Sequence, residues 1–252
     1  MKTLQNKVAL ITGAAAGMGL AIARLFAKEG AKLLLCDLDE ERVRALQHSI
    51  ESEGAEALAV RCDMAEAKEV EQLVQLCIDT FGSIDVLVNN AGIMDDFFPV
   101  DRVPPETWKK VIDVNLNGPF HTMRLALPEM LSRKSGSIIN IGSIGSHQGA
   151  RAGAAYTASK HALLGLTQNT AFLYAKDGIR CNLIAPGGVN TEIGLKMKPD
   201  PLGYERIMPG AANMPRMGEA TEIAQIALFL ASEASSLVNG ATITADAGWT
   251  AF

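Results

Sequence analysis

The sequence has little of what marks secreted, membrane-spanning or nucleic-acid-binding proteins. Cysteine is scarce, with four residues in 252, and the wide spacing matches neither a metal site nor a disulfide framework. The 23 basic residues are outnumbered by 28 acidic ones, so the net charge of −5 provides no basic surface for nucleic acid or an anionic membrane. No apolar run reaches the ~18 residues of a membrane span, and the start, MKTLQNK, lacks a signal-peptide hydrophobic region. We expect a reduced, cytoplasmic protein that binds neither nucleic acid nor a membrane.

The rest of the composition is that of an ordinary globular protein, 48% hydrophobic and 20% charged. No repeat or low-complexity stretch interrupts it, and we expect one domain over residues 1–252. Apolar runs that alternate with helical periodicity predict right-handed crossovers and a parallel sheet. Strands are expected at 8–12, 32–36, 57–62, 84–88, 137–141, 179–185 and 241–244. Helices are expected at 39–53, 66–81, 106–133, 156–177 and 219–232, besides one that begins near residue 18.

A glycine-rich turn follows the first predicted strand. Gly13, Gly17 and Gly19 come directly after the apolar run 8–12 and lead into a helical pattern. Such a turn leaves backbone N–H groups and the positive end of the helix dipole facing outward, where a phosphate can bind, and glycine lets the ligand approach. The spacing G-x3-G-x-G differs from the common dinucleotide fingerprint. By itself it fits a helix with a small-residue start equally well.

Asp37 favours the dinucleotide interpretation. It ends the second predicted strand, 18 residues beyond Gly19, where a carboxylate can accept hydrogen bonds from the diol of an adenosine ribose. The alternative is that Asp37 caps the next helix, because acidic residues follow at 39–41 and favour a first helical turn. The two roles are compatible.

Tyr156 and Lys160 form a pair with catalytic potential. They lie four residues apart on a predicted helix, so both side chains share one face. The helix follows the fifth strand, at the sheet edge where open α/β folds bind ligands. A tyrosine with a pKa of about 10 is a poor acid–base catalyst at neutral pH. We expect the Lys160 ammonium, together with the positive ring of an oxidised nicotinamide cofactor, to lower the pKa of Tyr156.

Two further polar residues precede this pair. Ser143 leaves the same sheet edge 13 residues before Tyr156, with a hydroxyl that can hold a substrate oxygen. The alternative for Ser143 is turn chemistry in a run of small residues. Asn115 lies in the long helical region just before Pro119, and taken alone it is an ordinary polar helix residue. Pro119 and Pro128 are expected to bend or segment that region.

The segment 191–217 has no clean periodicity. A long irregular segment in a compact domain is usually a functional lid, and methionines make a pliable apolar wall. The alternative is an amphipathic excursion packed on the body of the domain. The segment contains four prolines and the methionines Met197, Met208, Met214 and Met217.

In combination these residues resemble the short-chain dehydrogenase/reductase family over essentially the whole chain. The resemblance implies a single-domain Rossmann fold with a seven-stranded parallel sheet flanked by helices on both faces. It also implies a dinucleotide-binding oxidoreductase that needs no metal and forms a homotetramer through the helices expected at 106–133 and 156–177. The motifs, in order, are Thr12-Gly13-x3-Gly17-x-Gly19, Asp63, Asn89-Asn90-Ala91-Gly92, Asn115, Ser143, Tyr156-x3-Lys160 and Pro186-Gly187 with Thr191.

The resemblance implies a role for each catalytic residue. Tyr156 would be the general acid/base, and Ser143 would orient the substrate carbonyl or hydroxyl. Lys160 would bind the nicotinamide ribose and lower the pKa of the tyrosine, while Asn115 would hold a water in a proton relay. The residues expected to bind substrate are Ser143, Ile144, His147, Tyr156 and Gly187.

The cofactor roles follow in the same way. Asp63 would contact adenine, Asn90 would support the cofactor, and Thr191 would touch the carboxamide. The full set expected to bind the cofactor is Gly13, Ala16, Gly17, Met18, Gly19, Asp37, Leu38, Asp63, Met64, Asn90, Ala91, Gly92, Tyr156, Lys160, Pro186, Gly187, Val189 and Thr191.

Asp37 favours NAD(H) over NADP(H). A ribose 2′-phosphate would meet this carboxylate at close range, and like charges repel strongly in poorly solvated surroundings. NADP-preferring relatives usually carry a basic residue in the glycine turn or just after the second strand. Here the residues at 14–16, Met18 and Leu38 provide none. We expect NAD.

The substrate is predicted only as a class. An apolar pocket is indicated by Phe97, Phe98, Ile144, Val189 and the methionines of 191–217, and it fits a hydrophobic secondary alcohol, a hydroxysteroid or an acyl chain. His147 lies between Ser143 and Tyr156 and either faces the substrate or is a polar loop residue.

Two alternatives stay open. A 3-oxoacyl-[acyl-carrier-protein] reductase shares all these motifs, but it typically uses NADPH and docks an acidic carrier on basic residues. Asp37 and the negative net charge count against it, although local patches can override net charge. A non-catalytic NAD-binding regulator could use the same fold. It would not need the proton-transfer group that Tyr156 provides.

Overall fold

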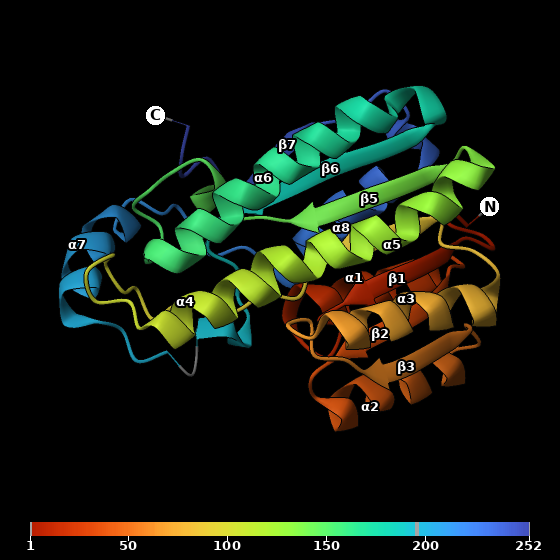
Figure 1. The fold of residues 1–252 in the computed structure, drawn as a ribbon, viewed down its shortest axis with the longest axis horizontal. Coiled ribbons are helices and arrows are strands. Elements are labelled where there is room, and N and C mark those ends of the chain that lie inside the picture. The colour runs from red at the N-terminus through yellow and green to blue at the C-terminus, as the bar shows by residue number, and fades with distance from the viewer. Residues whose placement is uncertain (1, 195–196, 252) are drawn as a thin grey trace.

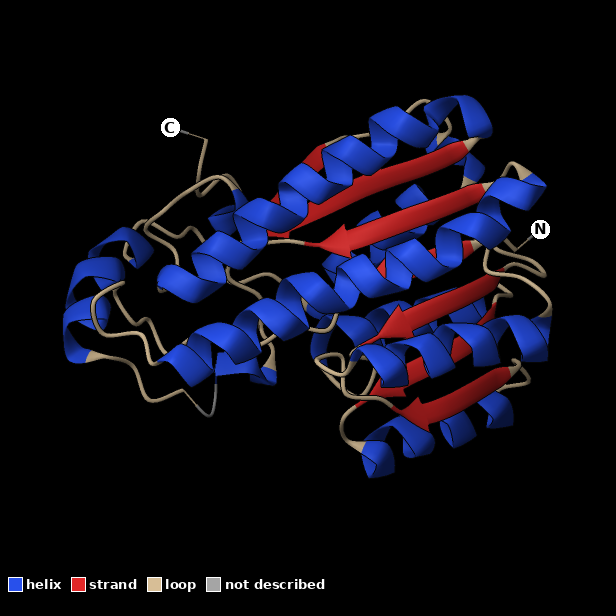
Figure 2. Cartoon of the chain, in the orientation of Figure 1, coloured by secondary structure: helices blue, strands red, loops and turns tan. Residues whose placement is uncertain are grey.

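The computed structural model describes residues 2–194 and 197–251, and it places a parallel sheet between two layers of helices (Figures 1 and 2). Within these residues the sheet has seven strands in the order β3-β2-β1-β4-β5-β6-β7, and every neighbouring pair is parallel. The expected fold class is confirmed. The order of the strands reverses between β1 and β4, and open α/β sheets bind ligands beyond the carboxyl ends of the strands at such a point.

The strands agree with the expected ranges to within two residues at each end. They are β1 Val8–Thr12, β2 Lys32–Asp37, β3 Ala57–Arg61, β4 Val86–Asn89, β5 Gly136–Ile141, β6 Ile179–Pro186 and β7 Thr242–Ala245. The α-helices are α1 Gly17–Lys28, α2 Glu40–Ser52, α3 Ala67–Phe81, α4 Pro105–Ile112, α5 Gly118–Arg133, α6 Ala154–Tyr174, α7 Pro201–Ala211 and α8 Ala220–Ala231. No helix in the described part of the chain is both long and apolar enough to cross a bilayer.

Side chains of β1 alternate between two apolar cores, because successive residues of a strand point to opposite faces of the sheet. Ala9 and Ile11 pack with residues of α1, α2 and α8, whereas Val8 and Leu10 pack with residues of α3 and α5. All five residues of β1 are buried. The central strands therefore appear in the sequence as continuous apolar runs rather than as alternating patterns.

The helical region expected at 106–133 is segmented. Between α4 and α5 lies a π-helical turn, Asp113–Asn117. Pro119 has no N–H to donate to the carbonyl of Asn115 four residues earlier, and the regular helical ladder is interrupted at that place. Pro128 is accommodated inside α5, which continues to Arg133. One of the two prolines thus segments the region as expected.

The segment 191–217 is not irregular throughout, and this expectation was wrong. It contains the 3-10 turn Glu192–Gly194 and the helix α7, whose N-cap Asp200 accepts hydrogen bonds from the N–H groups of Leu202 and Gly203. The helix gave no apolar period because Gly203 is its one buried residue among those described. Residues 195 and 196 of this segment lie outside the described residues. Figure 1 shows α7 beyond the carboxyl ends of the strands.

Candidate active site

The ends of β1 and β4 are tied together at the point where the strand order reverses. Thr12 accepts through Oγ1 from the backbone N–H groups of Asn90 and Ala91, both at 3.1 Å. The Asn90 amide donates in turn to the carbonyl oxygens of Thr12 and Gly13, at 2.9 and 2.8 Å. The side chain of Asn90 therefore fixes the backbone conformation of the glycine turn.

The glycine turn has the form of a phosphate cradle. Gly13 adopts a φ of +67°, and a Cβ on Gly19 would lie 2.1 Å from the Gly13 carbonyl oxygen, so a side chain fits poorly at either position. No side chain caps α1, whose N-cap is Ala16. The N–H groups of its first turn are therefore available to an anionic ligand. This arrangement fits the pyrophosphate of a dinucleotide.

Asp37 turns its carboxylate toward the glycine turn. Its Oδ2 accepts from the Ala15 N–H at 2.9 Å, and its Oδ1 accepts from the Asp39 N–H at 3.1 Å. The helix α2 is capped by Asp39, which accepts from the Arg42 N–H. The alternative that Asp37 caps this helix was therefore wrong, and its position at the end of β2 fits a ribose diol.

Asp63 and Met64 follow the neighbouring strand β3. The Asp63 carboxylate accepts from the Ala65 N–H at 2.9 Å, and its backbone N–H donates to Glu69 at 2.8 Å. Met64 is buried, while Leu38, after β2, has 57% of its surface exposed. The residues expected around adenine thus lie after adjacent strands, at one edge of the sheet.

The end of β6 returns to the same turn. A Cβ on Gly17 would lie 3.1 Å from Cγ2 of Thr191, so Thr191 lies against the start of α1. Gly187, after Pro186, donates its N–H to the carbonyl of Ala245 at 3.0 Å. Val189 pairs with Gly218 in an isolated parallel bridge. The two ends of the 191–217 segment are thereby anchored beside the glycine turn.

Ser143 and Tyr156 meet where β5 ends and α6 begins. Ser143 caps the 3-10 turn Ile144–Ser146 and accepts from the Gly145 N–H at 3.0 Å. It is also hydrogen-bonded to the Tyr156 side chain. The turn chemistry suggested as an alternative for Ser143 is therefore present, and it does not keep the hydroxyl from Tyr156.

Lys160 lies one helical turn beyond Tyr156. Its Nζ is 5.5 Å from the centroid of the Tyr156 ring and donates to the carbonyl of Ile141, the last residue of β5, at 2.8 Å. Both side chains are buried. The pair thus has the common orientation that the spacing predicted.

Burial dominates the ionisation of both groups. It raises the pKa of Tyr156 to about 12; the hydrogen bond to Ser143 acts in the opposite sense, and the charge of Asp95 adds to the increase. Burial lowers the pKa of Lys160 to about 8. Without a cofactor the loss of hydration of the phenolate sets the direction of this shift, and the lowering expected from Lys160 together with an oxidised nicotinamide stays a prediction. At neutral pH the phenol is a proton donor.

Asn115 is placed in the site by the π-helical turn. Its side chain accepts from the Ile93 N–H at 2.8 Å and donates to the Ile93 carbonyl at 2.9 Å and to Ser159 at 3.3 Å. A Cβ on Gly92 would lie 3.4 Å from the Asn115 oxygen and 3.6 Å from the Lys160 nitrogen. The fully buried Asn115 therefore stands beside Lys160 and does not face solvent.

Asp95 is part of this constellation, and sequence reasoning missed it. Its carboxylate is 1% exposed and accepts from the N–H groups of Gly153 at 3.0 Å and Tyr156 at 2.8 Å. Burial raises the pKa of Asp95, against the effect of these backbone hydrogen bonds. The available signal was a pair of acids, Asp95 and Asp96, in an otherwise apolar stretch between Ile93 and Phe98.

The residues expected to contact the substrate differ in burial and in their neighbours. Phe97 packs against a small apolar cluster that contains Tyr156. Met214 and Met217 approach Gly188, where a Cβ would lie 2.4 and 2.9 Å from their sulfur atoms. Ile144 is buried and His147 is exposed.

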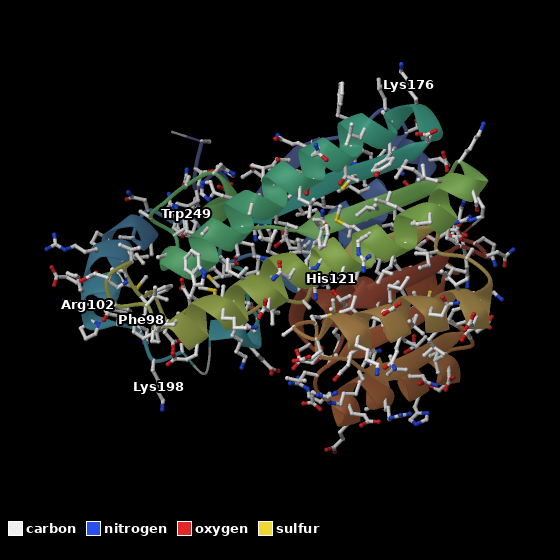
Figure 3. The ribbon with its side chains drawn as sticks, viewed as in Figure 1. Phe98, Arg102, His121, Lys176, Lys198 and Trp249 are labelled. Carbon is white, nitrogen blue, oxygen red and sulfur yellow. The ribbon has the colours of Figure 1, made fainter. Side chains whose placement is uncertain are left out.

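Trp249 and Arg151 form a second contact that the sequence did not indicate. The Arg151 guanidinium lies 4.2 Å from the centroid of the Trp249 ring, and both side chains donate to the carbonyl of Gly210 at the end of α7. Figure 3 shows Trp249 and Phe98 at the end of the molecule that carries α7. The C-terminal residues therefore help to position α7.

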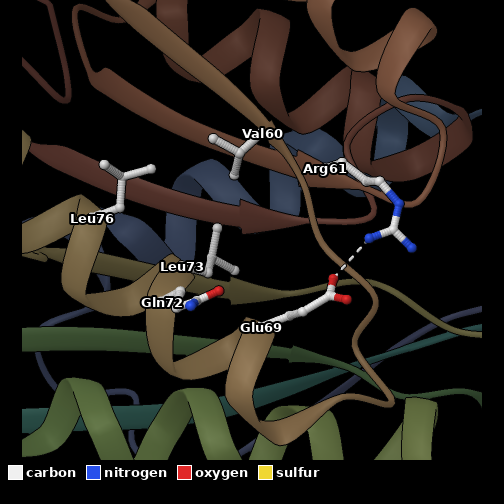
Figure 4. A pocket seen from close by; sticks show the side chains of 6 residues that line it. All are labelled: Val60, Arg61, Glu69, Gln72, Leu73 and Leu76. Atoms are coloured by element: carbon white, nitrogen blue, oxygen red, sulfur yellow. Dashed lines mark hydrogen bonds and ion pairs between the residues drawn. The ribbon is translucent and has the colours of Figure 1, made fainter.

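A hollow of about 400 Å³ lies elsewhere, between β3 and α3. The ion pair of Arg61 and Glu69, 2.9 Å apart, crosses it (Figure 4). Its lining residues are Val60, Arg61, Glu69, Gln72, Leu73 and Leu76. The hollow includes none of the residues discussed above except Glu69. The described residues contain no cluster of three or more side chains suited to a metal ion.

Comparison with known proteins adds the following. Residues 13–250 match the family model described as enoyl-(acyl carrier protein) reductase. The chain is 40% identical over 251 residues to 3beta-hydroxysteroid dehydrogenase 2 of Eggerthella lenta, covering 99% of this chain and 96% of that one. It is 39% identical over 260 residues to the short chain dehydrogenase adrF of Penicillium rubens, covering 99% of both.

Two solved structures have the same fold. Levodione reductase superposes with a TM-score of 0.90 at 34% identity, over 98% of this chain and 99% of that one. A Beutenbergia cavernae protein with NADP bound at low occupancy, described as an NAD(P) dependent gluconate 5-dehydrogenase, gives a TM-score of 0.89 at 35% identity over 99% of both chains.

Proposed function

The chain belongs to the short-chain dehydrogenase/reductase family of nicotinamide-dependent oxidoreductases, and on this premise we propose that it interconverts a secondary alcohol and a ketone with NAD(H). The observation that carries the proposal is the meeting of Ser143, Tyr156 and Lys160 beside the glycine turn. Lys160 donates to Ile141 at the end of β5, and a Cβ on Gly92, two residues after the Asn90 that fixes that turn, would lie 3.6 Å from its nitrogen. A protein that only bound the dinucleotide would need the cradle but not these three groups.

Each residue of the centre has a separate task. A bound nicotinamide dinucleotide supplies or accepts the hydride. Tyr156 donates a proton to the carbonyl oxygen in reduction and accepts it from the hydroxyl in oxidation. Ser143 holds the substrate oxygen within reach of the phenol. Lys160 holds the nicotinamide ribose, and Asn115, fixed against Ile93, positions a water behind it.

The oxidative direction requires that the phenol lose a proton. Burial raises the pKa of Tyr156 to about 12 in the chain without cofactor, and the positive charges of Lys160 and of an oxidised cofactor would act in the opposite sense. The reductive direction has no such requirement, because the protonated phenol is the stable form at neutral pH.

Asp37 supports NAD as the cofactor. Its carboxylate is held at the glycine turn by two backbone hydrogen bonds and would lie close to a ribose 2′-phosphate. Arg42, five residues later, is paired with Glu192 through two contacts of 2.7 and 2.8 Å and would have to leave this partner to neutralise a phosphate. The relative with bound NADP shows that the fold also accepts the phosphorylated cofactor. The choice therefore depends on Asp37 and its surroundings.

The substrate that we propose is an apolar secondary alcohol or ketone, such as a hydroxysteroid. Phe97 beside Tyr156 and the methionines near Gly188 provide apolar contacts at the catalytic edge. The 40% identity to a 3beta-hydroxysteroid dehydrogenase supports the same class. The name of the matching family model favours acyl thioesters as a second candidate class.

A substrate panel separates these classes. Secondary alcohols, hydroxysteroids, sugars and 3-hydroxyacyl thioesters are incubated with NAD, and NADH formation is followed by absorbance. Turnover of apolar alcohols supports the proposal, and turnover of thioesters alone replaces it with an acyl reductase. If nothing reacts while NADH binds tightly, the chain is a dinucleotide-binding regulator.

Replacement of the phenol tests the mechanism itself. In Tyr156→Phe the ring stays and the transferable proton is lost, so kcat should fall by about a thousandfold or more while the Kd for NADH changes little. Tyr174→Phe, in the same helix, is the matched control and should keep full activity. Normal turnover by Tyr156→Phe would contradict the assigned mechanism.

We extend the proposal to the setting of the enzyme. The segment 191–217 serves as a substrate lid on one dinucleotide-binding and catalytic domain, and the molecule works as a homotetramer. Four free, buried cysteines are consistent with a reducing, cytoplasmic compartment.

A further inference from the structure

We propose that Asp95 is a positioning residue of the catalytic centre, whose carboxylate fixes the first turn of α6 and thereby the direction in which Tyr156 presents its hydroxyl. The inference rests on the proposed function, because it concerns the residue that carries the proton there. Asp95 lies in the segment between β4 and α4, 61 residues before Tyr156.

The contacts of Asp95 are those of a helix cap supplied from a distance. Its Oδ1 accepts from the N–H groups of Gly153 and Phe97, at 3.0 and 3.3 Å, and its Oδ2 accepts from the Tyr156 N–H at 2.8 Å. The first N–H groups of a helix have no partner within the helix, and the N-cap of α6, Gly153, has no side chain to offer. Asp95 takes over this function.

The space around the carboxylate leaves it little freedom. Asp95 is 1% exposed, and a Cβ on Gly153 would lie 2.6 Å from both of its oxygens. One of the three residues that it anchors is Tyr156 itself. The ring packs with Val111, Ala152 and Ala155, which make apolar and therefore non-directional contacts. The backbone anchor at Tyr156 is thus the directional constraint on the phenol, besides Ser143 at its hydroxyl end.

The segment that carries Asp95 is held in a conformation with a steric cost. Asp96 and Phe97 both have positive φ values, 54° and 60°, although neither is glycine. Such residues persist where the surroundings determine them, and they cluster at functional sites. Two hydrogen bonds hold this conformation: Asp96 accepts from the N–H groups of Lys198 and Asp200 at 3.1 and 2.8 Å. The segment therefore contacts α6 on one side and the approach to α7 on the other.

The negative charge of Asp95 affects the pKa of Tyr156, which a neutral side chain making the same hydrogen bonds would not do. Among the described residues, the charged groups that bear on the phenol are Asp95 from this segment and Lys160 from α6. The neighbours from β5 and α4, Ser143 and Val111, are uncharged. The negative charge disfavours the phenolate, so its removal should make Tyr156 easier to ionise.

A single-tyrosine background makes this measurable. The chain has three tyrosines, so Tyr174→Phe with Tyr204→Phe leaves Tyr156 alone, and its ionisation can be followed by tyrosinate absorbance in the NAD complex. With Asp95→Asn we expect the midpoint to fall by about half a pH unit. In the tyrosine-replete enzyme kcat should fall about tenfold, with the Kd for NADH within about twofold. Asp96→Asn is the matched control: it removes the same charge one residue away, where the carboxylate binds Lys198, and the Tyr156 midpoint should not move.

Two results would overturn the role of Asp95: an unmoved Tyr156 midpoint or an unchanged kcat in Asp95→Asn. Should that variant not fold, Gly153→Ala decides, because it keeps the charge and displaces the carboxylate. A normal kcat in Gly153→Ala overturns the positioning role, and a reduced kcat with retained NADH affinity supports it. An inactive Tyr156→Phe beside an unaffected Asp95→Asn removes the role of Asp95 and leaves the proposed function standing.

Discussion

At the scale of single residues, the same side chain can serve a local and a catalytic purpose. Ser143 caps a 3-10 turn and still meets Tyr156. The Asn90 amide donates to the carbonyl groups of the glycine turn. It would therefore support a bound ligand indirectly, by holding the backbone of that turn in place. Burial of Lys160 lowers the stability of the folded chain, because the ammonium loses its hydration. The position of Lys160 beside Tyr156 requires this burial. Two predictions belong to this scale.

Asp37→Ala should reduce the preference for NAD over NADP. The substitution would remove the proposed ribose hydrogen bonds and the repulsion of a 2′-phosphate together, so the ratio of the two kcat/KM values should fall by about tenfold or more. Asp39→Asn is the matched control, because asparagine keeps the cap of α2 and the charge removed there does not face the turn. An unchanged ratio in Asp37→Ala would place the discrimination elsewhere.

Lys160→Met should stabilise the folded protein near neutral pH while abolishing activity. Burial lowers the pKa of Lys160 from 10.5 to about 8. Between these values the unfolded chain binds more protons than the folded one, so the stability of the wild type rises with pH there. The shift corresponds to roughly 3 kcal/mol, less what the hydrogen bond to Ile141 returns.

Urea unfolding of both proteins at about pH 7 and pH 9.5 measures this. The advantage of Lys160→Met should shrink at the higher pH. The titration of Tyr156, whose pKa burial raises to about 12, is common to both proteins and cancels in the difference. A difference that stays constant with pH would contradict the prediction.

At the scale of elements, the centre depends on where helices begin. The glycine turn includes the uncapped start of α1, and Tyr156, the proposed proton donor, lies in the first turn of α6. The π-helical turn before α5 directs Asn115 inward. The start of the 191–217 segment is joined to α2 by the ion pair of Arg42 and Glu192. This segment is the element expected to move.

Binding of ligands should protect the segment 191–217 from protease. Trypsin can cleave after Arg206 and Arg216, and closure over NADH with a ketone should slow these cuts several-fold. Lys176 lies at the opposite end of the molecule and serves as an internal control whose cleavage should not change (Figure 3). Equal rates with and without ligands would show that the segment is no lid.

At the scale of the whole molecule, apolar side chains remain on the outer faces of α5 and α6. Phe120 is 42% exposed, Phe172 83% and Leu173 56%, and both helices cover the same face of the sheet (Figure 1). Large apolar side chains left exposed on neighbouring helices are candidates for an association surface. The proposed homotetramer would cover it.

Phe172→Asp should therefore shift the protein from tetramer toward smaller species. A charge in an apolar interface is costly because it loses hydration without gaining a partner. Light scattering at micromolar concentration measures the mass. Val100→Asp is the control, because Val100 is 79% exposed on the loop between β4 and α4, which contacts the start of α6 whereas Phe172 lies near its end, and its replacement should leave the mass unchanged. A monomer in the wild type would contradict the expected assembly.

The sequence by itself determined the fold class, the strands and the positions of the motif residues. These features depend on local chemistry: apolar runs, glycine after β1, and the spacing of Tyr156 and Lys160 on one helix. They can be read without knowing what packs against them. The interruption of the helix before Pro119 is also predictable from the sequence, because proline has no N–H group whatever packs around it.

The tertiary structure alone decided what depends on burial and on contacts between distant segments. The pKa of Tyr156 rises because the folded chain removes water from the phenol, which the spacing of two residues does not reveal. The helix α7 shows no apolar period because it lies outside the core. Asp95 reaches Tyr156 across 61 residues of chain, a contact that only the packing of the β4–α4 segment against α6 creates.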